Sequence, residues 1–177
     1  MAKLRKFVAY RRLERPYTRR SKYRKYSYVR ANPNNKITRF DMGNTDTNKV
    51  FEYRVDLLSK TDLQIRHNAL EAARQTTIKL LEKSMGKSDF FFKIRVYPHH
   101  VLRENALASG AGADRLSTGM GHAFGKPIGI AARVFENQSV FSVSVDKKNL
   151  QVAKNALDRA RKKLPNKYAI VETLLKN

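Results

Sequence analysis

Two adjacent histidines, His99 and His100, are the side chains in this sequence best suited to acid–base or metal chemistry. Neighbouring side chains of an extended segment point in opposite directions, so such a pair rarely binds one ion together. The nearest downstream acid, Glu104, does not complete the HExxH pattern of zinc hydrolases. We therefore predict no catalytic residue, no metal site and no cofactor. We assign both histidines a structural or contact role near the base of the long segment in which they lie.

That segment, residues 98–127, holds five of the eight glycines and has no clear helix or strand pattern. Its glycines do not match a phosphate-binding fingerprint, because Gly119 and Gly121 have the wrong spacing for a dinucleotide loop and Pro127 stands where a P-loop needs Ser or Thr. Loops of this length inside a domain are usually functional or disordered. Sparse, mixed charges and interspersed apolar residues argue against disorder. We expect a loop whose glycines let the backbone approach a surface outside its own chain.

The net charge of +22 indicates a polyanionic partner, because binding one releases condensed counterions and relieves self-repulsion. The first 30 residues contain twelve Lys or Arg and one acid, so this arm carries half of the net charge. Five tyrosines lie among these cations, and a flat ring can stack on an exposed base for about 1–3 kcal/mol. A solvated tail would explain the cations but not the tyrosines, and the pattern of a membrane-surface helix is missing. We predict nucleic-acid contact by an extended or irregular arm that is ordered mainly by its partner.

The remaining composition narrows the class of protein. There is no cysteine, no apolar run approaches the ~18 residues of a membrane span, and no apolar signal-peptide core follows the basic N-terminus. We therefore expect a soluble protein that stays where it is made. The length of 177 residues suggests one domain plus an arm. The turn-forming residues 32–35 divide the chain into an arm at 1–32 and a single domain at 33–177, with the long loop at 98–127.

Alternation and helical spacing predict the elements that must position the arm and the loop. A Thr61–Gln64 capping box predicts a helix that ends at Met85, and residues 128–135 and 139–145 are expected to form a β-hairpin. In chain order the predicted elements are strands 36–41 and 50–58, helix 61–85, strands 90–97, 128–135 and 139–145, helix 146–164 and strand 168–171. This order predicts an α+β fold in which two helices cover one side of a mixed or antiparallel sheet.

Two patterns predict which faces are buried and which are basic. In strand 90–97 the apolar residues alternate inward, whereas Lys93 and Arg95 face outward, so one face of the sheet is expected to be basic. In helix 146–164 apolar residues at helical spacing form a stripe, and the opposite face is rich in Lys and Arg. For that helix face, a solvated role and a nucleic-acid-facing role both remain open.

Several motifs together resemble one known family. The matching segments are Pro16-Tyr17, Phe40-Asp41-x-Gly43, ALEAAR at 69–74, PHHVLREN at 98–105, AGADRLSTGM at 111–120 and AFGKP at 123–127. In this order they resemble the archaeal and eukaryotic L-ten-e family of ribosomal proteins, which is homologous to bacterial L-sixteen. Two places depart from the family pattern. Gly121 follows the Gly-Met pair where relatives usually have a basic residue, and Ala106-Leu107 stand where relatives often have Lys-Met.

The resemblance implies an α/β-hammerhead-type fold and a structural role in the large ribosomal subunit of an archaeal-type, cytoplasmic ribosome. It implies binding to large-subunit rRNA near the central protuberance and the tRNA sites. The internal loop that matches residues 102–114 would point towards the peptidyl transferase region. Neighbouring ribosomal proteins and nearby tRNA would be partners, with no membrane and no homo-oligomer. The alternatives are an RNA-processing enzyme that uses His99 or His100 and a free nucleic-acid-coating protein.

From the arm and the resemblance we predict two sets of site residues. The expected RNA-binding residues are Arg11, Arg12, Arg19, Arg20, Arg24, Lys25, Tyr17, Tyr23, Tyr26 and Lys126. The expected residues of the loop on the tRNA and peptidyl transferase side are Leu102, Arg103, Asn105, Ser109, Gly110, Gly112, Asp114 and Arg115.

Overall fold

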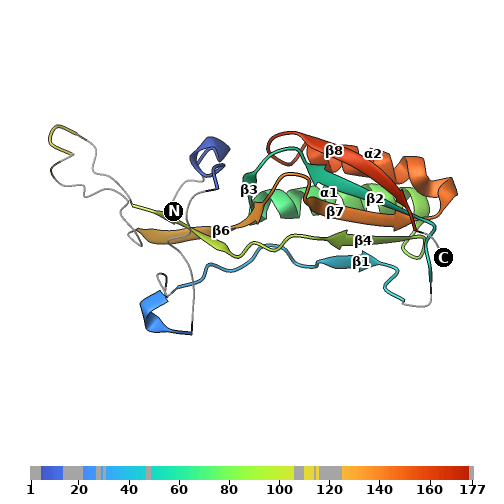
Figure 1. Cartoon of the computed structure of the whole chain (residues 1–177), viewed down its shortest axis with the longest axis horizontal. Coiled ribbons are helices and arrows are strands. Elements are labelled where there is room, and N and C mark those ends of the chain that lie inside the picture. Colours follow the sequence, from blue (N-terminus) through green and yellow to red (C-terminus); the bar gives the residue numbers. More distant parts are fainter. Residues whose placement is uncertain are drawn as a thin grey trace.

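A computed structural model describes residues 5–13, 22–26, 29, 31–46, 49–105, 110–113, 115 and 125–175. The molecule is elongated, with a helix-covered sheet at one end and a narrow extension at the other (Figure 1). In chain order its elements are η1 (Phe7–Ala9), η2 (Arg24–Tyr26), β1 (Asp41–Gly43), β2 (Tyr53–Ser59), β3 (Leu63–Arg66), α1 (His67–Met85), β4 (Phe90–Ile94), β5 (His100–Glu104), β6 (Lys126–Val134), β7 (Ser139–Val145), η3 (Lys147–Asn149), α2 (Leu150–Arg161) and β8 (Tyr168–Leu174). Two helices with antiparallel strands confirm the α+β class.

A five-stranded sheet in the order β1-β4-β7-β2-β8 forms the body of the molecule, and every neighbouring pair in it is antiparallel. α1 and α2 lie on one face of this sheet, as expected (Figure 1). Phe92 and Phe141 from the sheet and Leu70 and Leu157 from the helices belong to one buried cluster. Each such side chain contributes about 1.5–3 kcal/mol by leaving water, which makes this cluster the main source of stability.

The helix predicted from residue 61 begins later than the capping box suggested. Residues 63–66 form β3, which pairs with β6, and α1 begins at His67. Arg66 occupies the N-cap position without a side-chain cap. The prediction was wrong because residues 63–66 pair with a strand that lies 65 or more residues away, and this pairing buries Leu63 and Ile65 in the sheet. The local pattern does not show such a distant partner. The predicted end was right, because Gly86 follows Met85 with φ +79° and its N–H bonds to the Glu82 carbonyl.

The predicted hairpin of residues 128–135 and 139–145 is also wrong. β6 belongs to a separate three-stranded sheet in the order β3-β6-β5, whereas β7 pairs with β2 and β4 in the large sheet. The chain does turn at Asn137, whose φ is +59°, but it passes from one sheet into the other. The segment 98–127 is likewise more regular than predicted, because β5 and the start of β6 pair with each other inside it.

Smaller differences concern the ends of elements. Of the strand expected at 36–41, only Asp41 belongs to β1, although the Phe40 carbonyl also accepts the Ile94 N–H at 2.9 Å. Further back, the side-chain oxygen of Asn35 accepts the Ile37 N–H in a local turn. The second helix starts at Leu150 after the η3 turn, and Asp146 makes no side-chain cap. The last strand, β8, lies at the edge of the large sheet.

The described part of the chain contains no helix that could cross a membrane. Neither α1 nor α2 combines the length and the apolar composition that a bilayer-crossing helix requires.

Candidate nucleic-acid interface

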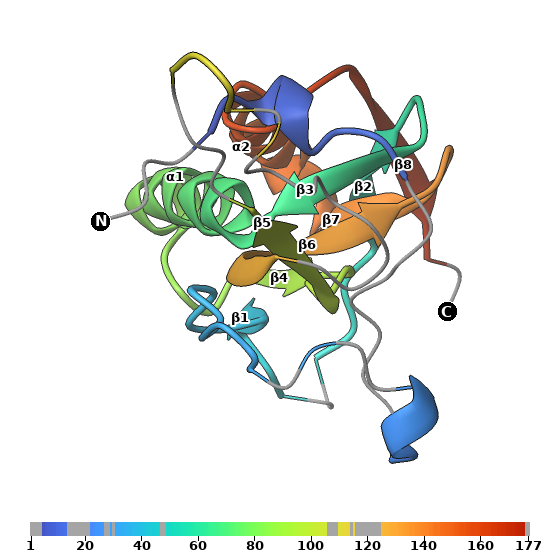
Figure 2. The same cartoon turned by 90° about the vertical axis from the view of Figure 1, so that its left-hand side faces the viewer.

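One end of the molecule brings together the segments that the sequence marks as functional. The sheet β3-β6-β5 projects from the body, with the turn at residues 110–113 beyond it (Figure 1). Seen from that end, η1 lies above this sheet and η2 below it (Figure 2). We call the sheet β3-β6-β5, with the described arm residues and the 110–115 turn, the cationic end. Its exposed cations are Arg5, Lys6, Arg11, Arg12, Lys22, Arg24, Lys25, Arg115 and Lys126.

The first part of the arm is held along β3 by Gln64. The backbone N–H of Gln64 donates to the carbonyl oxygen of Arg11 at 3.1 Å. Its side-chain Nε2 donates to the carbonyl oxygens of Tyr10 at 3.2 Å and Arg12 at 2.5 Å. Gln64 is 5% exposed, so these hydrogen bonds are shielded from water. Local sequence patterns do not indicate this role, since the apparent capping box predicts that Gln64 lies in a helix.

Arg66 and Glu104 hold the same part of the arm from the two outer strands. Arg66 donates to the carbonyl oxygen of Arg5 at 2.7 Å, and its guanidinium lies 6.0 Å from the ring centroid of Tyr10. The Arg5 guanidinium forms an ion pair with Glu104 at the end of β5, which raises the pKa of Arg5. Contacts within the protein therefore hold the segment from Arg5 to Arg12, whereas the arm was expected to be ordered mainly by its partner.

The arm reaches the opposite face of the small sheet further along the chain. Val29, which is 7% exposed, packs in a separate apolar cluster with Val101 of β5 and Ile130 of β6. Ile130 and Gln64 point to opposite faces of the same sheet. Gln64 pairs with Arg133 and therefore faces the same way as Arg133. Arg133 and Ile130 are three residues apart on β6, so their side chains point to opposite faces. The described parts of the arm thus contact both faces of the sheet.

The predicted RNA-binding residues that are described all lie on this end. Arg11 and Arg12 follow η1, and Arg24 and Lys25 lie in η2, with all four exposed. Tyr23 and Tyr26 are 66% and 42% exposed, which is unusual for rings of this size. Lys126 begins β6 and is exposed. Tyr17, Arg19 and Arg20 lie outside the described residues.

The predicted loop residues divide into a sheet part and a protruding part. Leu102 is 6% exposed and pairs with Gly129, and Arg103 lies in the same strand, so neither belongs to an irregular loop. Asn105 follows β5 and is half-buried. The other described residues of this set, Gly110, Gly112 and Arg115, are exposed and lie in the outermost turn, whereas Ser109 and Asp114 lie outside the described residues.

The outermost turn has a backbone that depends on glycine. Gly110 and Gly112 have φ values of +127° and +79°, and the Ala113 and Arg115 N–H groups donate to their carbonyl oxygens. A Cβ atom at either glycine would meet no described atom within 4 Å. This turn lies at the far tip of the cationic end, and no described atom would contact a side chain added at its two glycines.

The two histidines lie in different surroundings. The exposed ring of His99 lies 4.4 Å from the ring centroid of Tyr97, whereas His100 pairs with Ala131 inside the small sheet. Burial, together with Arg133 and Arg103, lowers the pKa of His100 to about 4. In the described part of the chain, no group of three or more His, Asp or Glu side chains is arranged to bind a metal ion.

The basic sheet face expected from Lys93 and Arg95 is only partly neutralised. Lys93 pairs with Asp41 at 3.4 Å, and Arg95 donates to the hydroxyl of Ser142 at 2.8 Å. Ser142 in turn donates to Asp56, which is 7% exposed. Lys93 is thus paired with an acid, whereas Arg95 is hydrogen-bonded to a neutral hydroxyl and stays exposed.

An α+β body with a basic, tyrosine-bearing arm and a glycine turn placed together at one end has a layout typical of basic proteins that bind nucleic acid. Comparison with known proteins defines the family. The family model of ribosomal protein L16p/L10e matches residues 17–171. The chain belongs to this family.

Similar proteins include three archaeal large ribosomal subunit proteins uL16. The protein of Staphylothermus marinus is 50% identical over 161 residues, covering 91% of this chain and 88% of its own. That of Methanocella arvoryzae is 48% identical, covering 84% of this chain and 86% of its own. That of Archaeoglobus fulgidus is 45% identical, covering 92% of this chain and 88% of its own. The resemblance found from the motifs is confirmed over most of the chain.

Proposed function

We propose that this chain is a structural constituent of the large ribosomal subunit, and not an enzyme, and that it binds rRNA through its cationic end. The family and the names of its archaeal relatives support a ribosomal role. The observation that carries the rRNA contact is the gathering of both described arm segments and the glycine turn at one end of an elongated molecule (Figure 1). Exposed Arg and Lys side chains would neutralise phosphates there, and Tyr23 and Tyr26 would stack on bases.

The finer placement follows the family resemblance. The protein would lie near the central protuberance, close to the tRNA sites, in the cytoplasmic ribosome. Residues 1–32 would act as an rRNA-binding arm, and residues 33–177 as the domain that carries it. The turn at Gly110 and Gly112 would point towards the peptidyl transferase region, which suits a segment with open space around its backbone. Partners would be rRNA, neighbouring ribosomal proteins and nearby tRNA.

The salt dependence of rRNA binding tests the arm. Replacing Arg11, Arg12, Arg24 and Lys25 by Ala removes four exposed cations from the cationic end. If each contacts one phosphate, the slope of log affinity against log salt should become shallower by about 3 units. A matched control replaces Lys83, Lys87, Lys147 and Lys148, four exposed lysines at the other end of the molecule, where Phe90 pairs with Val145. An equal change of slope in both variants would contradict the assignment of rRNA binding to the cationic end.

Two alternatives give different results in simple assays. A free nucleic-acid-coating protein would leave large subunits during a high-salt wash, whereas a structural constituent would stay and co-sediment with them. An RNA-processing enzyme would cleave RNA and lose turnover in His99→Ala or His100→Ala. The low pKa of His100 favours the non-enzymatic proposal, because an efficient general base titrates near the working pH.

A further inference from the structure

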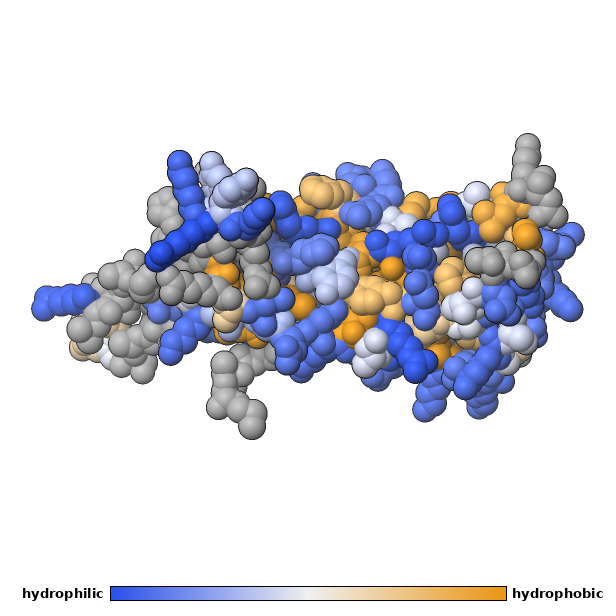
Figure 3. Space-filling view, turned by 90° about the horizontal axis from the view of Figure 1, so that it is seen from below, coloured by the Kyte–Doolittle hydropathy of each residue, from blue (hydrophilic) through white to orange (hydrophobic). Residues whose placement is uncertain are grey.

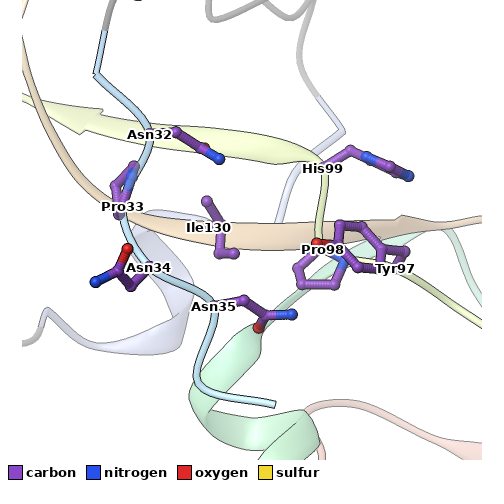
Figure 4. Close-up of a pocket in the computed structure, with 8 residues that line it drawn as sticks. All are labelled: Asn32, Pro33, Asn34, Asn35, Tyr97, Pro98, His99 and Ile130. Atoms are coloured by element: carbon purple, nitrogen blue, oxygen red, sulfur yellow. The ribbon is translucent and has the colours of Figure 1, made fainter. Parts of the chain in front are cut away.

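A pocket of about 430 Å³ opens where the end of the arm meets the link between β4 and β5. One wall is the asparagine-rich segment 32–35, the other is the segment 97–99, and Ile130 of β6 lies between them (Figure 4). The volume lies within the range of pockets that hold small organic groups. On the molecular face seen from below, hydrophobic surface shows between hydrophilic side chains in the middle of the molecule (Figure 3).

The pocket has apolar surfaces that suit a flat ring. Pro33 and Pro98 lie on opposite sides of the opening, with the Ile130 side chain between them (Figure 4). Ile130 is 3% exposed and is fixed by packing against Val29 and Val101. Because Val29 belongs to the arm, the same packing holds the asparagine-rich wall near the floor of the pocket.

Tyr97 adds an aromatic surface that is held rigidly in place. Its ring stacks on Phe40 with a centroid distance of 5.3 Å and an interplanar angle of 21°. The His99 ring lies 4.4 Å away on a chain turn closed by a hydrogen bond from the His99 N–H to the Tyr97 carbonyl. Tyr97 is nevertheless 49% exposed, so a large ring that does not serve the core is kept at the edge of the pocket.

The asparagines supply hydrogen-bonding groups of both kinds. The Asn32 amide projects into the space between the two walls, and it makes no hydrogen bond to any described residue (Figure 4). Asn35 uses its oxygen to accept the Ile37 N–H at 3.0 Å, which leaves its NH2 group available. Asn34 points away from Ile130 (Figure 4). A free asparagine amide presents one donor face and one acceptor beside each other, which matches N7 and the N6 amino group of adenine.

We propose that this pocket receives one unpaired adenine of an RNA strand, with Asn32 reading its N6/N7 edge and Tyr97, Pro98 and Ile130 contacting its ring. The proposal rests on the rRNA-binding function given above and names one nucleotide that the site selects. RNA is the ligand that fits, because proteins recognise RNA sequence by taking up unstacked bases on aromatic surfaces and hydrogen-bonding their edges. η2 and the exposed Lys36 lie on either side of the asparagine-rich wall in the chain and would hold the flanking phosphates.

Hairpin RNAs that differ only in one bulged nucleotide test this proposal with the full-length protein. The set carries a bulged A, G, C or U, no bulge, or 7-deazaadenine, which has a C–H group in place of N7. We expect the bulged-A hairpin to bind about tenfold more tightly than the unbulged one, and the deaza base to lose most of that preference. Asn32→Ala should lose the preference in the same way, whereas Asn34→Ala, the matched control, should keep it.

The coupling between base and side chain is the decisive measurement. In Asn32→Ala, the A and 7-deaza hairpins should bind equally well, because the partner of N7 is gone. Equal affinity for all hairpins in the unmodified protein, or equal effects of Asn32→Ala and Asn34→Ala, would overturn the adenine site. The arm's salt slope and the co-sedimentation with large subunits do not depend on the bulge. A protein that passes those two assays but shows no bulge preference refutes this inference alone, whereas failure in all of them refutes the ribosomal proposal as well.

Discussion

Gly43 is the position at which we expect an added methyl group to destabilise the fold most. It ends β1 opposite Phe91, with a φ of +89°, and a Cβ atom there would lie 2.2 Å from the carbonyl oxygen of Phe90. That oxygen already accepts the Asn44 N–H at 2.8 Å, and Phe90 is fully buried in the pairing of β4 with β7. Neither partner can move away without breaking hydrogen bonds of the sheet.

The cost of Gly43→Ala combines two effects. A left-handed conformation costs a non-glycine residue about 1–2 kcal/mol, and overpacking against a fixed neighbour costs about 1–3 kcal/mol. We expect a loss of about 4 kcal/mol in the free energy of unfolding, which lowers the Tm of a protein of this size by about 8–16 °C. Calorimetry or urea unfolding of the full-length protein at high salt, without RNA, measures this loss.

Gly86 provides the matched control. Its φ is also positive, at +79°, but a Cβ atom there would meet nothing within 4 Å. Gly86→Ala should therefore show only the conformational cost, about 2 kcal/mol or 4–8 °C in Tm. If the two variants lose the same stability, the close approach between Gly43 and Phe90 has no energetic weight and the reasoning fails.

Three further perturbations have defined outcomes. The pKa of His100 is about 6.5 in the unfolded chain and about 4 in the folded protein, so between these values only the unfolded chain binds the proton. The free energy of unfolding should therefore fall by about 1–2 kcal/mol as pH drops through this window. In urea titrations at pH 7 and pH 5, His100→Gln should lack that part of the loss. Asp56→Ala deprives Arg54 and Ser142 of their shared acceptor and should lower the free energy of unfolding by about 2–4 kcal/mol, whereas an unchanged midpoint would mean that water replaces the carboxylate. Deleting residues 107–112 should leave the Tm within a few degrees but impair subunit function, and global unfolding of that variant would contradict the view of this loop as peripheral.

Local patterns in the sequence predicted the parts of the fold that depend on neighbouring residues. The alternation of β4 buried Phe90, Phe92 and Ile94 as expected, and Gly86 ended α1. The amphipathic stripe of α2 buries Ala153 and Leu157. These features are visible because period and capping are encoded within a few residues.

Pairing over long distances could not be predicted in the same way. No residue near Leu63 indicates that Leu63 pairs with a strand 65 or more residues later, or that α1 therefore begins further along the chain. The roles of Gln64 and Glu104 in holding the arm depend on that same sheet. The pocket around Asn32 and Tyr97 joins two segments that look like a turn and a strand end when taken separately.

The bond between Gln64 and Arg11 has a consequence for the protein before it meets RNA. β3 is an outer strand, and an outer strand with free N–H and C=O groups invites the strands of other copies to add to it. By lying along β3, the arm shields that strand from self-association. Removal of residues 1–13 should therefore make the RNA-free protein prone to aggregate, a liability separate from any loss of affinity.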